Sequence, residues 1–293
     1  MKKALFNNYT NNTKGVEILL KEINHFFESI YLFFINGFKI KRVLTYPELP
    51  RKRTSFYKLC KRMNLAITNK PRKKILFAAQ WEDITIRERA EVLEKLATKK
   101  TVLNINCRDI SKTVIDKKFE ECFGYCTRVD PTKHKGKCLK KNELNAQHDG
   151  VEVMCPIDKP EPGYIYQIII NNFINNDFVY DIRVPVIKEC LNFVYIKEKK
   201  KGVRYESNLF RSKLVDIKEI LSDEEIQNLN KFCKHINLDY GELDVLRNND
   251  DNKIYVIDVN YTAFGPAQKL SKEKKEYALS EMEKQFKRHF PFD

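Results

Sequence analysis

The sequence lacks the features that identify a membrane or secreted protein. Its 293 residues contain one tryptophan and nine glycines, and no uncharged apolar run reaches the length of a membrane-spanning helix. The most apolar stretch, residues 26–38, is interrupted by Glu28. Because this stretch also lacks a basic start and a small-residue cleavage site, we expect neither a membrane span nor a secretory signal.

Patterned cysteines and phosphate-binding glycine motifs are missing as well. The eight cysteines are scattered and form no C-x-x-C pair, so a zinc site is not predicted. Cys122 and Cys126 are one helical turn apart, but we expect core residues there. Unpatterned thiols in a chain of this length favour a reduced, cytoplasmic protein. The absence of G-x-G-x-x-G and of a P-loop argues against Rossmann-type and P-loop nucleotide binding.

Acidic residues are scarce in the first quarter of the chain. Residues 1–74 hold 17 Lys and Arg against 4 Asp and Glu, whereas the remainder holds 37 against 36. We expect a basic, helical N-terminal segment over residues 1–74, with helices at 15–37 and 53–66. Its charge suits binding to nucleic acid, an anionic membrane surface or an acidic substrate. A sequence that is generally rich in Lys and Asn would carry the same charge without any such partner. A dedicated nucleic-acid partner is not favoured; peripheral membrane contact remains open.

Hydrophobic periodicity divides the rest of the chain into two parts. Strands at 73–80 and 101–106 alternate with helices at 83–100 and 109–124, which predicts a small α/β domain over residues 75–130. From residue 131 onward, strand patterns dominate. Ser222 and Glu225 form a capping box that predicts a helix over 222–237, and a charged amphipathic helix is expected at 272–290. We expect residues 131–293 to form a second domain, with a lid at about 135–190 and a C-terminal part at about 191–293.

The last two expected strands carry polar residues. Asp258 and Asn260 point to the same face of the strand at 253–260, because strand side chains alternate. They suit a strand end with turn-forming residues, or a pair of oxygen ligands for a hard cation. The turn at 248–252 allows antiparallel pairing with the strand at 240–247, which brings Asp244 near Asp258. Two carboxylates and an amide oxygen suit Mg²⁺, so the pairing favours a metal site.

Several further motifs precede this hairpin in a fixed order. They are "CLKKNELNAQHDG" (138–150), "YIYQIII" (164–170), "YDIRVPVI" (180–187), Lys197 and "RYESN" (204–208), followed by "GELDVL" and "YVIDVN". Together they resemble the ATP-grasp superfamily over residues 135–268, in the type that joins carboxylates to amines. The resemblance implies a mixed α+β / α/β architecture: an ATP-grasp fold with a small N-terminal α/β (pre-ATP-grasp) domain and a helical basic N-terminal extension. It also implies ATP and Mg²⁺ as cofactors.

The resemblance assigns expected roles to individual residues. The metal ligands are Asp244, Asp258 and Asn260, and the nucleotide-binding residues are Gln167, Asp181, Lys197 and either Lys140 or Lys141, with spacing favouring Lys141. Arg183 is expected to bind the ATP phosphates, Arg204 to stabilise the acyl phosphate, and Asn208 to orient the acceptor. The chain departs from the pattern in two respects. Asp258 stands where many relatives have Glu, and the lid stretch has one glycine.

We therefore expect an ATP- and Mg²⁺-dependent ligase that forms an amide through an acyl phosphate, with an amino acid or a glycan precursor as acceptor. Likeness to surface-polysaccharide ATP-grasp proteins suggests the glycan acceptor. A small-molecule kinase, or a nucleotide-dependent binding protein that docks through its basic segment, are the alternatives. The sequence identifies neither the carboxylate nor the acceptor, and it leaves the oligomeric state open.

Overall fold

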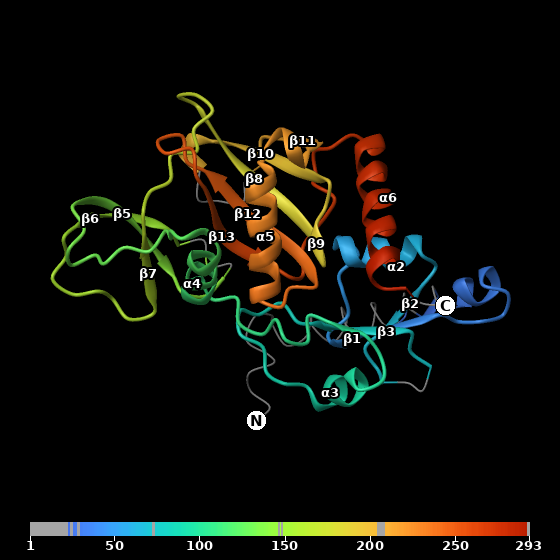
Figure 1. The fold of residues 1–293 in the computed structure, drawn as a ribbon. Coiled ribbons are helices and arrows are strands. Elements are labelled where there is room, and N and C mark those ends of the chain that lie inside the picture. The colour runs from blue at the N-terminus through green and yellow to red at the C-terminus, as the bar shows by residue number, and fades with distance from the viewer. Residues whose placement is uncertain are drawn as a thin grey trace.

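The computed structural model describes residues 23, 26, 27, 30–71, 74–145, 147, 149–203 and 209–291. Three β-sheets organise this part of the chain: a parallel sheet near the N-terminus, a small antiparallel sheet and a larger central sheet. In Figure 1 the small sheet lies to the left, the central sheet in the middle and the N-terminal sheet at the lower right. Among the described helices, none is long and apolar enough to cross a membrane.

The N-terminal sheet consists of four parallel strands in the order β2-β1-β3-β4. Its strands are β1 (Arg42–Pro47), β2 (Ala66–Thr68), β3 (Phe77–Trp81) and β4 (Val102–Leu103), and its helices are α2 (Ser55–Arg62) and α3 (Glu91–Ala97). Strands β1 and β2 lie in the segment predicted to be helical, so that prediction is wrong for them. The sheet also crosses the domain boundary predicted at residue 75. The division of the chain into three parts therefore remains a prediction.

The helix predicted at 83–100 begins only at Glu91. Tertiary contacts hold the preceding residues in an extended path. Ile86 forms a β-bridge with Asp109, and the buried Arg87 donates to the carbonyl of Glu82, at 2.8 Å from Nη2. The Arg87 guanidinium also lies over the ring of Tyr261, 3.1 Å from its centroid. These contacts replace the local helical preference and bring residues 82–88 against the end of β13, which is described below.

The small antiparallel sheet has the order β6-β5-β7 and follows helix α4. The bounds are α4 (Lys112–Phe123), β5 (Gly136–Asn142), β6 (Val151–Cys155) and β7 (Tyr164–Gln167). Helix α4 ends at Gly124, which adopts the left-handed conformation that glycine tolerates best (φ +76°). The sheet has its own small core of Cys138, Cys155 and Tyr166. It occupies the region predicted as the lid.

The central sheet has six strands, five of them in the order β11-β10-β8-β12-β13, with β9 paired to β8. The elements of this region are β8 (Phe178–Ile187), β9 (Glu189–Cys190), β10 (Phe193–Lys200), η2 (Lys201–Val203), β11 (Arg211–Asp216), η3 (Ile217–Glu219), α5 (Asp223–His235), β12 (Tyr240–Arg247), β13 (Ile254–Asn260) and α6 (Lys272–His289). All pairings in this sheet are antiparallel. The predicted capping box is confirmed: Ser222 and Glu225 bond reciprocally at the start of α5.

The central sheet presents two chemically different faces. One face is apolar and packs against α4 and α5 through residues such as Ile182, Val184 and Leu243. The opposite face is apolar only at one end, where Ile187, Tyr195 and Tyr240 join a core shared with α2, α6 and the N-terminal sheet. Trp81 is buried in that shared core, so it does not line a cleft. The remainder of this face is polar.

Candidate functional site

The polar part of the central sheet carries a row of charged side chains on four adjacent strands. Along each strand, residues two apart face the same side, and the register aligns them across the sheet. Arg183 on β8 lies opposite Asp244 on β12, and Asp244 lies opposite Asp258 on β13. The other members of the row are Asp181 on β8, Lys197 and Lys199 on β10, Glu242 on β12 and Asn260 on β13.

Asp244 and Asp258 form the acidic centre of the row. A register shift between Asp244 and Val245 leaves one extra residue in β13, which is a β-bulge beside the pair. Burial and the charge of Asp244 raise the pKa of Asp258 to about 6, while Lys112, Lys141 and Arg183 oppose this rise. Two carboxylates held opposite each other repel when both are ionised, so this pair favours binding of a cation.

The residues at this centre fit a divalent cation. Asp244 Oδ1 is buried and has no hydrogen-bond donor with adequate geometry, although it is ion-paired with Arg183 Nε. Asp258 Oδ1 accepts from the backbone of Val259 at 2.9 Å, which leaves Oδ2 for a ligand. The described residues hold no cluster of three or more His, Cys, Asp or Glu side chains suited to a metal. The carboxylates of Asp244 and Asp258 would therefore act together with oxygens from elsewhere.

Asn260, the third predicted ligand, lies on the same face, but its side chain is hydrogen-bonded to a nearby residue. Its Oδ1 accepts from the backbone nitrogen of Thr262 at 2.9 Å, which is a turn-type bond at the end of β13. The amide oxygen has a second lone pair for a cation. Asn260 therefore forms the turn expected at a strand end, and its role as a metal ligand stays a prediction.

Arg183 lies between two carboxylates on β12. Its Nη1 is 3.4 Å from Glu242 Oε2, and its Nε contacts Asp244. Burial acts to lower the pKa of Arg183, but the surrounding carboxylates, Asp244 foremost, outweigh burial and raise it. The guanidinium therefore remains charged beside the acidic centre. This is a suitable position for binding a phosphate near a metal ion.

Lys197 is a largely buried ammonium that forms no ion pair within the described part of the chain. Burial lowers the pKa of Lys197, and the charge of Arg183 lowers it further. Its cross-strand neighbour Asp181 is paired with Lys199 instead, at 2.7 Å. The nearby carboxylates of Glu242, Asp244 and Asp181 oppose this fall. Lys197 is therefore placed to receive an anion.

Lys112 brings a second such ammonium to Asp258 from outside the sheet. It is the first residue of α4, and its Nζ donates to Leu144 O at 2.9 Å and to Asn145 Oδ1 at 3.3 Å. Both of these partners are neutral. Burial lowers the pKa of Lys112, while Asp258 is the strongest influence that raises it. The geometry therefore adds Lys112 to the residues around the acidic centre.

The lid loop after β5 is held against this centre. Besides accepting from Lys112, Asn145 donates two hydrogen bonds: its backbone nitrogen donates to Thr85 Oγ1 at 2.9 Å, and its Nδ2 donates to Val259 O at 3.3 Å. Glu143 accepts from the backbone of Thr113 at 2.8 Å. These contacts join the lid, the start of α4 and β13 around Asp258.

The structure distinguishes Lys140 from Lys141, between which the sequence could not decide. Lys140 pairs with Glu161, and its Nζ lies 4.2 Å from the ring centroid of Tyr164 on the neighbouring strand β7. Lys141 points to the other side of β5, and its positive charge lowers the pKa of Asp258. This arrangement favours Lys141 as the phosphate-binding lysine.

Gln167 is directed into the protein and away from the charged row. Its side chain is buried, and Nε2 donates to Thr127 Oγ1 at 2.6 Å. Thr127 in turn donates to the buried Asp116. A role for Gln167 in nucleotide binding would therefore involve its backbone. Arg204 and Asn208, predicted to act on the acyl phosphate and the acceptor, lie outside the described residues.

Three members of the site, Glu242, Lys199 and Lys112, were not predicted from the sequence. Glu242 precedes Asp244 by two residues on the same strand, so strand alternation was a sufficient signal for it. Burial is the main cause of its raised pKa, which Arg183 and Lys197 oppose. Lys112 follows Ser111 at the predicted start of a helix, but no local pattern indicates that this helix end lies beside β13.

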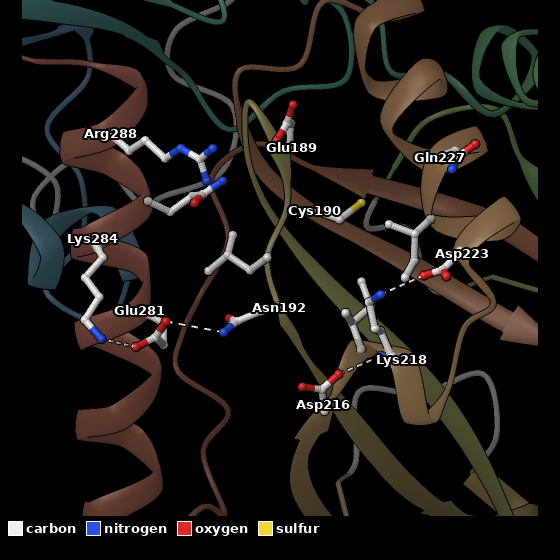
Figure 2. A pocket seen from close by; sticks show the side chains of 14 residues that line it. Glu189, Cys190, Asn192, Asp216, Lys218, Asp223, Gln227, Glu281, Lys284 and Arg288 are labelled. Carbon is white, nitrogen blue, oxygen red and sulfur yellow. Dashed lines mark hydrogen bonds and ion pairs between the residues drawn. The ribbon is translucent and has the colours of Figure 1, made fainter.

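A separate cavity of about 660 Å³ lies between α5 and α6, away from the charged row. Figure 2 shows Glu281, Lys284 and Arg288 of α6 on one side of it and Asp223 and Gln227 of α5 on the other. Its charged side chains are largely paired with one another; Lys218 lies 2.9 Å from Asp223, and Lys284 2.6 Å from Glu281. None of the predicted site residues lines this cavity.

Residues 157–279 match the family model of the RimK-like ATP-grasp domain, and this range spans β7 to β13 and part of α6. A comparison with curated proteins found no match.

Solved structures with a similar fold include ligases. D-alanine–D-alanine ligase from Bacillus anthracis has a TM-score of 0.53 at 11% identity, covering 86% of this chain and 95% of that chain. Its complex with ATP has a TM-score of 0.52 at 10% identity, covering 87% and 97%. The ATP-grasp ligase PsnB, complexed with minimal precursor, Mg and ADP, has a TM-score of 0.51 at 13% identity, covering 77% and 90%. At these identities the likeness shows the fold.

Proposed function

Because residues 157–279 of this chain form a RimK-like ATP-grasp domain, we propose that the protein is an ATP- and Mg²⁺-dependent ligase that joins a carboxylate to an amine. The observation that carries the proposal is the alignment of Arg183, Asp244 and Asp258 on three adjacent strands. It places a fixed cation beside two carboxylates suited to Mg²⁺. Transfer of a γ-phosphoryl group requires such charges, because negative charge spreads over the phosphate oxygens in the transition state.

Each charged residue of the row has a part in this reaction. Asp244 and Asp258, with Asn260 beside them, would hold Mg²⁺, which neutralises charge on the phosphate oxygens. Arg183, Lys197 and Lys141 bind and orient the phosphates of ATP, and Lys112 adds a fourth cation from α4. Asp181 keeps Lys199 in place by their ion pair. Lys140 is instead paired with Glu161 in the lid.

The chemistry proceeds in two balanced steps. A substrate carboxylate oxygen attacks the γ-phosphorus, ADP leaves and an acyl phosphate forms. The amine nitrogen then attacks the carbonyl carbon, phosphate leaves, and the nitrogen loses a proton to give the amide. We assign Arg204 to stabilising the acyl phosphate and the tetrahedral intermediate, and Asn208 to orienting the acceptor. The acceptor classes are an amino acid or a glycan precursor, the latter as in surface-polysaccharide biosynthesis in the cytoplasm.

Product analysis tests this proposal. The purified chain is incubated with ATP, Mg²⁺ and panels of carboxylates and amines. We expect ADP and phosphate in equal amounts with an amide, and a hydroxamate when hydroxylamine replaces the amine. ADP with a stable phosphorylated product would identify a kinase, and ATP binding without turnover across the panels would favour a nucleotide-dependent binding protein. Asp244→Asn should abolish turnover, whereas Asp250→Asn, in the exposed turn after β12, should not.

A further inference from the structure

A strongly exposed aromatic surface lies outside the candidate site, on the helical turns that precede β1. We define this aromatic surface as Phe26, Phe27, Tyr31, Phe34, Ile35 and Phe38. Phe34 and Phe38 are 62% and 68% exposed, and Tyr31 is 63% exposed. Figure 1 shows the turn in blue, projecting at the edge of the molecule beside β2. Large contiguous apolar patches are rare on soluble domains and mark interaction surfaces.

The turn is attached to the body by its other side. Leu32 is buried, and Asn36 Nδ2 donates to the carbonyl of Asn64 at 3.0 Å, in the connection between α2 and β2. Leu32 and Asn36 are four residues apart and therefore share one side of the helix. The aromatic surface is thus the side of an anchored turn that the described residues leave exposed.

The end of the turn is built to present Phe34 and Phe38. The nitrogen of Phe38 donates to Phe33 O at 2.9 Å, and that of Gly37 donates to Phe34 O at 3.3 Å, which is the pattern of a Schellman cap. The ring of Phe38 packs 5.5 Å from that of Phe33 and 5.9 Å from that of Phe34. Phe38 adopts φ +60°, an unusual conformation for an aromatic residue. The cap holds this residue outward although its backbone conformation is unfavourable.

Positive charge borders the aromatic surface. Lys39 and Lys41 follow it directly and are exposed, and residues 29–47 contain no Asp or Glu. The surplus of basic residues extends over the whole of residues 1–74. Aromatic and aliphatic side chains with lysines at the rim are the composition of surfaces that lie in a membrane interface.

We propose that the aromatic surface, with Lys39 and Lys41, docks the protein on an anionic lipid membrane. The phenyl rings enter the interface between headgroups and acyl chains, and the lysines pair with lipid phosphates. A second copy of the chain is a poorer occupant, because pairing two such surfaces would bring the lysines of both copies together. Nucleic acid is also poorer, because Ile35 and the clustered rings offer little for phosphates. The proposal goes beyond the ligase function and does not depend on it.

Vesicle flotation with the full chain tests the proposal. The probes are vesicles of phosphatidylcholine alone and vesicles of phosphatidylcholine mixed with phosphatidylglycerol. We expect binding to the anionic vesicles, weakened at high salt. Phe34→Ser and Phe38→Ser should each reduce binding at least about tenfold, as expected for losing a buried aromatic side chain. Lys39→Gln with Lys41→Gln should together reduce binding to anionic vesicles roughly thirtyfold, at about 1 kcal/mol per lysine.

Matched controls isolate the surface. Tyr277→Ser removes another exposed aromatic, on α6, and Lys99→Gln with Lys100→Gln removes two exposed lysines after α3; both variants should bind like the parent. Circular dichroism checks that each variant is folded. Absence of binding to either vesicle would overturn the proposal. So would a dimer in solution that Phe38→Ser dissociates, or binding of single-stranded RNA in preference to anionic vesicles.

Discussion

Asp244 on β12 lies directly opposite Asp258 on β13, and both carboxylates face the side of the sheet that carries Arg183 and Lys197. The pair is unfavourable in the protein alone, because burial and mutual repulsion act against ionisation and raise the pKa of Asp258 to about 6. A divalent cation reverses this effect. The residues that suit Mg²⁺ binding therefore reduce the stability of the metal-free protein.

Replacing Asp258 by Asn should raise the stability of the metal-free protein, although it removes a predicted metal ligand. An acid whose pKa is raised on folding lowers stability as pH rises from its unfolded to its folded pKa, here from about 4 to about 6. Above this window, Asp258→Asn should raise the free energy of unfolding of the metal-free protein by about 3 kcal/mol, since one pKa unit corresponds to about 1.4 kcal/mol. The gain should vanish well below pH 4. Urea denaturation in the presence of a chelator measures both values.

The same variant should lose the response to ligand. The parent protein should be stabilised by an ATP analogue only when Mg²⁺ is present, and Asp258→Asn should show little of that increment. Asp251→Asn, in the exposed turn before β13, is the control and should respond like the parent. Equal stabilisation of parent and Asp258→Asn by Mg²⁺ and nucleotide would exclude Asp258 as a metal ligand.

Lys112 should contribute to nucleotide affinity although it lies outside the matched domain. Lys112→Met removes a charge-assisted contact to phosphate, so we expect ATP affinity to fall roughly tenfold or more. Lys117→Met, at an exposed site on the same helix, is the matched control. Isothermal titration with an ATP analogue and Mg²⁺ gives the affinities, and unaltered binding by Lys112→Met would remove this residue from the site.

Lys197 should act on the same ligand from the sheet. Lys197→Met should weaken ATP binding by about tenfold, on the order of one charge-assisted hydrogen bond. Lys213→Met, on the neighbouring strand β11, changes a lysine that pairs with Glu198 on the other face. It should leave the affinity for ATP intact. A nucleotide affinity that is equally reduced in both variants would indicate a general effect on the sheet.

Helix α5, which packs on the apolar face of the central sheet, begins at the capping box of Ser222 and Glu225. Ser222→Ala removes the 3.1 Å bond from the Glu225 nitrogen to Ser222 Oγ. This loss should lower the free energy of unfolding by about 1 kcal/mol, with nucleotide affinity unchanged. Ser222→Thr should retain most of the stability. Chemical denaturation compares the three proteins, and a Ser222→Ala variant as stable as the parent would show that the cap contributes nothing.

The strands that carry the site were predictable because their pattern is local. Alternation along β12 and β13 placed Asp244, Asp258 and Asn260 on one face, and the intervening turn allowed the strands to pair. The order of motifs then suggested the fold. The structure agrees with both, and it shows that Asn260 also forms a turn with Thr262.

The remaining site residues depend on contacts between distant segments. Lys112 reaches Asp258 only because α4 packs on β13, and nothing near Lys112 in the sequence encodes that contact. Residues 83–90 have a helical pattern, yet Arg87 is held by Glu82 and Tyr261 in an extended segment. Strands β1 and β2 were missed because they are short and lie among basic residues, where no alternation is visible.

The central claim is that the charged row binds Mg²⁺ and the phosphates of ATP. A crystal structure of the protein with a non-hydrolysable ATP analogue and Mg²⁺ tests it most directly. We predict a metal ion on Asp244 and Asp258, with the phosphates contacted by Arg183, Lys197 and Lys112. A nucleotide bound elsewhere, for example in the cavity between α5 and α6, with Asp244 and Asp258 free of metal, would contradict the account.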